Sequence, residues 1–74
     1  MKIIVGIPAF NEEKNIAKII TRLNKITDSI VVCNDGSTDL TSEIAKKMGA
    51  VVINHEKNLG YGGAIRSIFL KSRE

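Results

Sequence analysis

Three short segments of the 74-residue chain carry side chains that could take part in binding chemistry, and each follows a run of apolar residues. They are residues 8–13 (PAFNEE), 34–39 (NDGSTD) and 58–66 (NLGYGGAIR). Their residue types suit small polar ligands such as nucleosides and phosphates. Flat bases bind apolar walls, sugar hydroxyls bind acceptors, and phosphates bind N–H groups and positive charge.

The first segment places an aromatic residue in a short loop ahead of a helix. Phe10 can seat a flat base, and Glu12 can accept hydrogen bonds from a base or a ribose. A purely structural interpretation stays open, in which Phe10 belongs to the core and Asn11 caps the helix. In that case Glu12 and Glu13 favour the positive end of the helix dipole.

The second segment places a carboxylate at the end of a strand. Asp35, followed by a glycine, can read a hydrogen-bond donor on a base or bind a ribose hydroxyl. The alternative is a turn in which Ser37, Thr38 or Asp39 caps the next helix. A phosphatase-type nucleophile is excluded, because Cys33 stands where the nucleophilic aspartate is required.

The third segment has three glycines within four positions, which is a poor start for a helix unless the backbone must approach something closely. Gly60, Gly62 and Gly63 leave N–H groups exposed, and Arg66 lies one turn further on, where it can add charge for a phosphate. The alternative is a flexible entry to a packed helix with a solvated Arg66. The dinucleotide-binding fingerprint does not fit, because Ile65 occupies its last glycine position.

These segments are positioned by three repeats of a strand followed by a helix. Continuous apolar runs predict buried strands over residues 2–7, 29–34 and 50–54, and Pro8 is expected to end the first because it has no N–H group. A helix capped by Asn11 follows the first strand. The predicted apolar stripes of the three helices are Ile16, Ile19, Ile20 and Leu23, then Leu40, Ile44, Ala45 and Met48, then Ala64, Ile65, Ile68 and Phe69.

Repeats of this length imply right-handed crossovers and a parallel sheet. We predict a three-layer, Rossmann-like α/β fold with three strands in the order 3-2-1 and helices on both faces. The third helix returns across the sheet, which creates a topological switch point beside the first strand. The first strand is left with an open edge, through which two copies of the chain could pair as a homo-oligomer.

Composition places the chain among soluble globular proteins. Apolar residues make up 43%, charged residues 26%, and the net charge is +3. One cysteine, Cys33, permits neither an internal disulfide nor a cysteine-based zinc site, and we expect it to be a small buried residue. His55 is a lone histidine, expected to lie at the surface or to be satisfied by hydrogen bonds.

A competing hypothesis is nucleic-acid binding. Basic residues recur every four positions in the first helical segment, and such a stripe can track phosphates. No aromatic residue is interleaved with them, so a solvated helix face is the preferred interpretation and nucleic acid an unlikely partner. The residues are Lys14, Lys18 and Arg22, with Lys25 nearby.

In this order and at this spacing, the three segments resemble the opening motifs of the family 2 glycosyltransferases, which are inverting enzymes with the GT-A nucleotide-sugar-binding fold. The resemblance covers essentially the whole chain. The sequence GYGGA is especially similar to the branch that glycosylates polyprenyl or dolichyl phosphate. The resemblance implies a UDP- or GDP-linked sugar donor, a polyprenyl phosphate acceptor, and a cytoplasmic location at the membrane surface in the intact protein.

The resemblance also assigns nine positions to nucleotide binding. Residues 8–10 would wall the base, with Phe10 where the family usually has tyrosine, and Glu12 would contact the nucleoside. Asp35 matches the second acid of the family's Asp-Asp-Gly-Ser motif and would help hold the base. Asn34 replaces the first acid, and its amide can still form neutral hydrogen bonds. The nine residues are Pro8, Ala9, Phe10, Glu12, Asn34, Asp35, Ser37, Gly60 and Arg66.

Two parts of such an enzyme are missing from these 74 residues. The first is the family's Asp-x-Asp motif, which holds Mg²⁺ or Mn²⁺ on the diphosphate, and the second is the catalytic base that deprotonates the acceptor. We therefore assign no catalytic and no metal-binding residue. The nucleotide-binding part is therefore expected at residues 1–74, as the N-terminal portion of a GT-A domain. This polypeptide alone is predicted to be inactive.

Overall fold

The computed structural model describes residues 3–73, without the side chains of Tyr61 and Ser72. Strands and helices alternate as predicted, while Lys2 of the first predicted strand lies outside the described residues. The elements are β1 (Ile4–Ala9), α1 (Ile16–Leu23), β2 (Ser29–Asp35), α2 (Thr41–Lys47), β3 (Val51–His55) and α3 (Gly60–Ser72).

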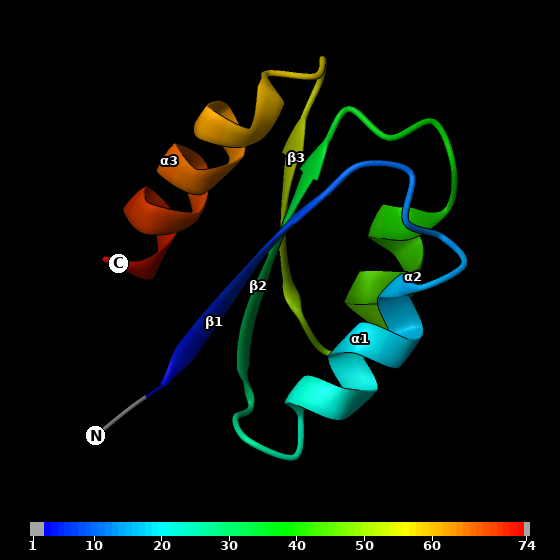
Figure 1. The fold of residues 1–74 in the computed structure, drawn as a ribbon, viewed down its shortest axis with the longest axis vertical. Helices are drawn as coiled ribbons and strands as arrows, with labels where there is room; N and C mark the ends of the chain where they lie inside the picture. The colour runs from blue at the N-terminus through cyan, green and yellow to red at the C-terminus, as the bar shows by residue number, and fades with distance from the viewer. Residues whose placement is uncertain (1–2, 74) are drawn as a thin grey trace.

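The three strands form one parallel sheet in the order β1-β2-β3, with β2 in the middle. Figure 1 shows α1 and α2 on one face of the sheet and α3 on the other. The helix α3 packs against β1 and β2, so the chain has crossed back over the sheet. The predicted fold class, strand order and placement of helices on both faces are confirmed.

The main core lies between the sheet and the helices α1 and α2. Ile16 and Ile20 of α1 and Val32 of β2 are fully buried there, together with Ala45 of α2. On the opposite face α3 approaches β1 closely. A Cβ atom added at Gly6 would lie 2.3 Å from Ile68 Cγ2, so only glycine allows this approach without a shift.

Pro8 does not end the first strand, which corrects the sequence-based expectation. The strand β1 continues to Ala9, and Pro8 pairs in register with Cys33. Within the described residues β1 lies at the edge of the sheet and has β2 as its single neighbour. An edge strand tolerates proline, because backbone groups on its outer side have no ladder partner to lose.

Asn11 does not cap α1, which is a second correction. The helix begins five residues later at Ile16, follows Asn15, and has no acidic residue in its first turn. Asn11 itself has a φ of +52°, in the left-handed region that asparagine tolerates better than most residues. The side-chain oxygen of Asn11 accepts a hydrogen bond from Thr38 N instead of from an N–H group of α1.

Three predicted core positions are exposed. Leu40 is 54% exposed because it precedes α2, and Thr41 takes the buried place at the helix start. Ile65 and Phe69 are 41% and 59% exposed, because α3 faces the sheet through Ala64 and the half-buried Ile68. A residue one position away from such a stripe is rotated by about 100° around the helix axis, which turns Ile65 and Phe69 toward solvent.

Candidate functional site

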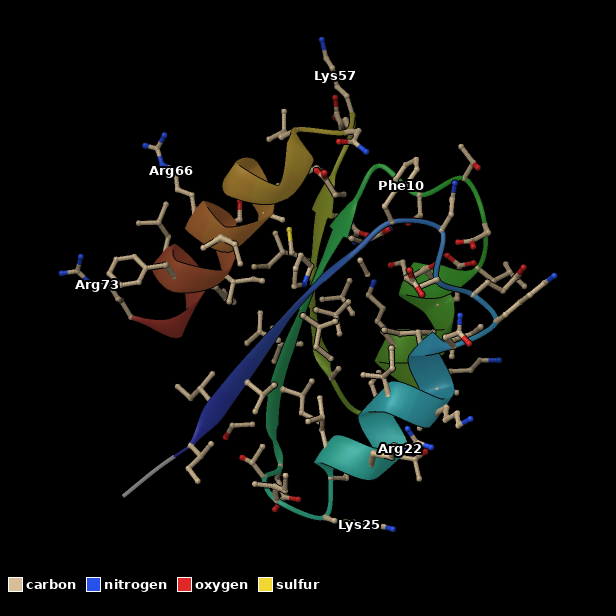
Figure 2. The ribbon with its side chains drawn as sticks, viewed as in Figure 1. Phe10, Arg22, Lys25, Lys57, Arg66 and Arg73 are labelled. Atoms are coloured by element: carbon tan, nitrogen blue, oxygen red, sulfur yellow. The ribbon has the colours of Figure 1, made fainter. Side chains whose placement is uncertain are left out.

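A cleft of about 320 Å³ lies where the carboxyl ends of β1 and β2 meet the start of α3. This is the switch point of the sheet, where open α/β folds bind ligands. Residues from all three predicted segments line it: Pro8, Ala9, Phe10, Glu12, Asp35, Asn58, Gly60 and Ala64. Figure 2 shows Phe10 at this end of the sheet.

The loop after β1 is held in place by side chains of the loop after β2 and of the first residue of α2. Three consecutive backbone N–H groups donate to them: Asn11 N to Ser37 Oγ at 2.8 Å, Glu12 N to Thr41 Oγ1 at 2.9 Å, and Glu13 N to Asp39 Oδ2 at 3.1 Å. In return, Asn11 Oδ1 accepts from Thr38 N at 2.9 Å. The clamp fixes the backbone on both sides of Glu12 and just after Phe10, whose side chain is 48% exposed and free to stack on a ligand.

Asp35 closes the other side of the cleft and is 5% exposed. Its Oδ1 accepts from His55 Nδ1 and from Leu59 N, both at 2.8 Å, and its Oδ2 accepts from Gly60 N at 2.9 Å. The hydrogen bond from His55, followed by the one from Leu59 N, lowers the pKa of Asp35 below its ordinary value. The side chain is therefore an anion that ties β2 to the first residue of α3.

The Asp35 carboxylate retains room for a ligand. An ionised carboxylate offers about four lone-pair positions and no donor. Three of them are taken by His55, Leu59 and Gly60, which leaves one acceptor position on Oδ2 of a residue that lines the cleft. Such a group accepts a hydrogen bond from an N–H or O–H group of a ligand. It repels a ligand that places a hydrogen-bond acceptor at the same position.

His55 is satisfied by hydrogen bonds, as expected. Its Nε2 lies 2.7 Å from Ser67 Oγ, and Cys33 Sγ lies 3.7 Å from the same ring nitrogen. Burial, and secondarily the charge of Asp35, raises the pKa of the Cys33 thiol, which agrees with its interpretation as a small buried residue. Sequence reasoning missed the partnership of His55 with Asp35. That partnership depends on the register of β3 on β2, which pairs these two residues and which no local sequence pattern specifies.

Six of the nine predicted residues line the cleft, and three lie elsewhere. Asn34 is buried and donates from Nδ2 to Asn54 Oδ1 at 3.0 Å, while its Oδ1 accepts from Ser37 N at 3.3 Å. The hydroxyl of Ser37 belongs to the clamp. Arg66 is exposed on α3 and points away from the sheet (Figure 2). Asn58 and Ala64 line the cleft without having been predicted.

The basic stripe of α1 does not serve the cleft. Figure 2 shows Arg22 and Lys25 at the end of the molecule opposite Phe10. Lys14 and Lys18 are also exposed, as a solvated helix face requires. Arg22 and Lys25 therefore lie away from the candidate site.

Residues 3–73 contain no group of three His, Cys, Asp or Glu side chains that could hold a metal ion. Of the residues that line the cleft, Glu12 and Asp35 carry carboxylates, and two such side chains do not make up the group of three ligands that a resident metal needs. Over the same residues, the helices are too short or too polar to cross a bilayer.

The sheet, the returning α3 and the cleft at the switch point define the N-terminal region of a GT-A glycosyltransferase fold. A solved structure of glucosyl-3-phosphoglycerate synthase from Mycobacterium tuberculosis, in complex with Mn²⁺, UDP-glucose and phosphoglyceric acid, matches it with a TM-score of 0.75. The sequences are 32% identical, and the match covers 86% of this chain and 27% of that one.

Residues 4–74 match the sequence model of glycosyl transferase family 2, and the chain therefore belongs to this family. An uncharacterized protein of Methanocaldococcus jannaschii is 52% identical over 65 residues, which is 86% of this chain and 27% of that protein. Dolichyl-phosphate hexose transferase of Haloferax volcanii is 48% identical over 63 residues, which is 82% of this chain and 27% of that protein. The chain thus spans about a quarter of the length of these relatives.

Proposed function

We propose that residues 1–74 form the nucleotide-binding part of a GT-A domain in an inverting glycosyltransferase that uses a UDP- or GDP-linked sugar. The observation that carries this proposal is the open acceptor position of Asp35, which lies in the same cleft as the exposed ring of Phe10. Uracil and guanine each present an N–H group on the edge that such an acceptor reads. The UDP-glucose in the complex of the solved relative supports the donor class.

Besides Asp35, five of the lining residues have a role in this proposal. Phe10 stacks on the base, with Pro8 and Ala9 as the adjoining wall, and Glu12 accepts from a ribose hydroxyl. Gly60 has a φ of +80°, and its N–H group already donates to Asp35. Gly60 therefore contributes a turn that a residue with a Cβ atom adopts at a cost, rather than a free donor for phosphate.

The acceptor and the metal belong to the same proposal. The dolichyl-phosphate hexose transferase among the relatives supports a polyprenyl phosphate acceptor, which would place the intact enzyme at the cytoplasmic surface of a membrane. Departure of a nucleoside diphosphate requires charge neutralisation, for which the solved relative holds Mn²⁺. We propose that Mg²⁺ or Mn²⁺ is held by residues other than 3–73, since these lack the ligands.

The test is nucleotide titration of the 74-residue protein, followed by amide NMR. UDP or GDP is expected to shift the amide resonances of residues 8–12 and 58–64. CDP is expected to bind more weakly than UDP, because cytosine has an acceptor where uracil has an N–H group. Asp35→Asn should lower the affinity for UDP about tenfold, in line with the loss of a hydrogen bond to a charged group. The affinity for CDP should fall less.

Asp28→Asn is the matched control, because Asp28 is exposed at the amino end of β2, away from the cleft. Both variants should remain folded by circular dichroism. The proposal is wrong if UDP and GDP cause no shift in the unmodified protein. It is also wrong if Asp28→Asn and Asp35→Asn affect UDP binding equally.

A further inference from the structure

Three side chains from three different elements form one hydrogen-bonded chain behind the cleft. Asp35 ends β2, His55 ends β3, and Ser67 lies on the face of α3 that covers the sheet. The distance from Asp35 Oδ1 to His55 Nδ1 is 2.8 Å, and that from His55 Nε2 to Ser67 Oγ is 2.7 Å. The imidazole is thus held at both nitrogens, and its side chain is 11% exposed.

The direction of the first hydrogen bond is fixed by chemistry. The carboxylate of Asp35 can only accept, so His55 Nδ1 carries the proton and donates. Ser67 can donate to Nε2 of a neutral ring or accept from a protonated one, so it anchors the ring in either state. His55 therefore stands between the middle of α3 and the carboxylate that lines the cleft.

The donors on Asp35 are distributed unevenly. Oδ1 accepts two, from His55 and Leu59, whereas Oδ2 accepts one, from Gly60. This difference leaves the free lone pair on Oδ2. Without His55 each oxygen would hold a single backbone donor, and the two oxygens would become equivalent acceptors for a ligand.

We propose that His55 is a positioning residue that orients the Asp35 carboxylate, so that a single oxygen reads the donor edge of the base. This inference rests on the proposed nucleotide-binding function and adds a determinant of base selectivity to it. Its removal lowers the affinity for UDP and the preference for UDP over CDP. A lower selectivity for UDP over CDP separates this role from a merely structural one, because partial unfolding would lower the affinities for both nucleotides equally.

The experiment compares His55→Ala, His55→Asn and His55→Gln in the full chain, with UDP and CDP as probes. The amide nitrogen of asparagine takes the place of Nδ1, whereas that of glutamine takes the place of Nε2. His55→Ala should bind UDP about tenfold more weakly and show a smaller preference for UDP over CDP. His55→Asn should recover to within about threefold of the unmodified protein, and His55→Gln should not.

A second readout uses the fact that His55 is the sole histidine. Its ring nitrogen resonances are therefore unambiguous in NMR spectra, and they should show a protonated Nδ1 that shifts when UDP is added. Should His55→Ala fail to fold, the contrast between asparagine and glutamine and this NMR signal still carry the test.

The inference is overturned if UDP affinity and selectivity are unchanged in a folded His55→Ala variant. It is equally overturned if the asparagine variant is as weak as the glutamine variant. Failure of the proposed function looks different, because the unmodified protein would then bind neither UDP nor GDP, and the inference would fall with it.

Discussion

Gly36, in the loop after β2, packs against the backbone of the loop after β3, and replacing it with alanine should lower the stability of the protein and disturb the cleft. Its φ is +78°, and a Cβ atom there would lie 2.7 Å from Asn58 N and 2.9 Å from the carbonyl carbon of Lys57. Both contacts are with backbone, which cannot rotate away as a flexible side chain can. The segment before Gly60 would have to move, and with it the donors that hold Asp35.

The magnitude follows from two separate costs. A non-glycine residue in the left-handed region costs about 1–2 kcal/mol, and overpacking adds about 1–3 kcal/mol. Gly36→Ala should therefore lower the free energy of unfolding by about 2–5 kcal/mol, a large fraction of the roughly 4–11 kcal/mol expected for 74 residues. Gly49→Ala separates the two costs, because Gly49 has a φ of +90° with nothing within 4 Å of an added Cβ atom.

The assay is urea unfolding of both variants, followed by UDP titration of the folded proteins. Gly49→Ala should lose about 1–2 kcal/mol and keep the UDP affinity of the unmodified protein. Gly36→Ala should lose about 1–3 kcal/mol more and bind UDP more weakly. The reasoning is refuted if the two variants lose equal stability, or if Gly36→Ala binds UDP as tightly as Gly49→Ala.

Three further predictions concern pH, catalysis and assembly. Folding lowers the pKa of Asp35, so the contribution of Asp35 to stability is full above the ordinary pKa of 3.8 and is lost as the pH falls through that value towards the lower folded pKa. Urea unfolding between pH 6 and pH 2 should therefore show a steeper loss of stability in the unmodified protein than in Asp35→Asn. Equal pH dependence of the two proteins would contradict this prediction. The 74-residue protein with Mn²⁺, UDP-glucose and a polyprenyl phosphate should release no UDP by chromatography, because residues 3–73 lack a metal-binding group; measurable turnover would show the prediction to be wrong. The unpaired outer edge of β1 should allow two copies of the chain to pair, so light scattering should detect a dimer, and Ile4→Lys should raise its dissociation constant. A protein that is monomeric at millimolar concentration would argue against this pairing.

Local patterns in the sequence determined the repeats, the strand order and the position of the cleft. Apolar runs and helical stripes depend on neighbouring residues, and right-handed crossovers then fix which ends of the strands meet. Phe10, Glu12, Asp35 and Gly60 could therefore be placed around one cleft before any coordinates were known, and the structure brings them together there.

Tertiary structure alone decided where several side chains point. Asn34 donates from its side chain to Asn54 on the neighbouring strand and does not line the cleft, whereas Asp35 does. On α3 the buried stripe through Ala64 and Ile68 turns Arg66 to solvent. The left-handed Asn11 and the pairing of His55 with Asp35 depend on contacts between residues more than 19 positions apart. Local periodicity carries no information about such contacts, because the register between strands and the fit between loops are set only when the whole chain packs.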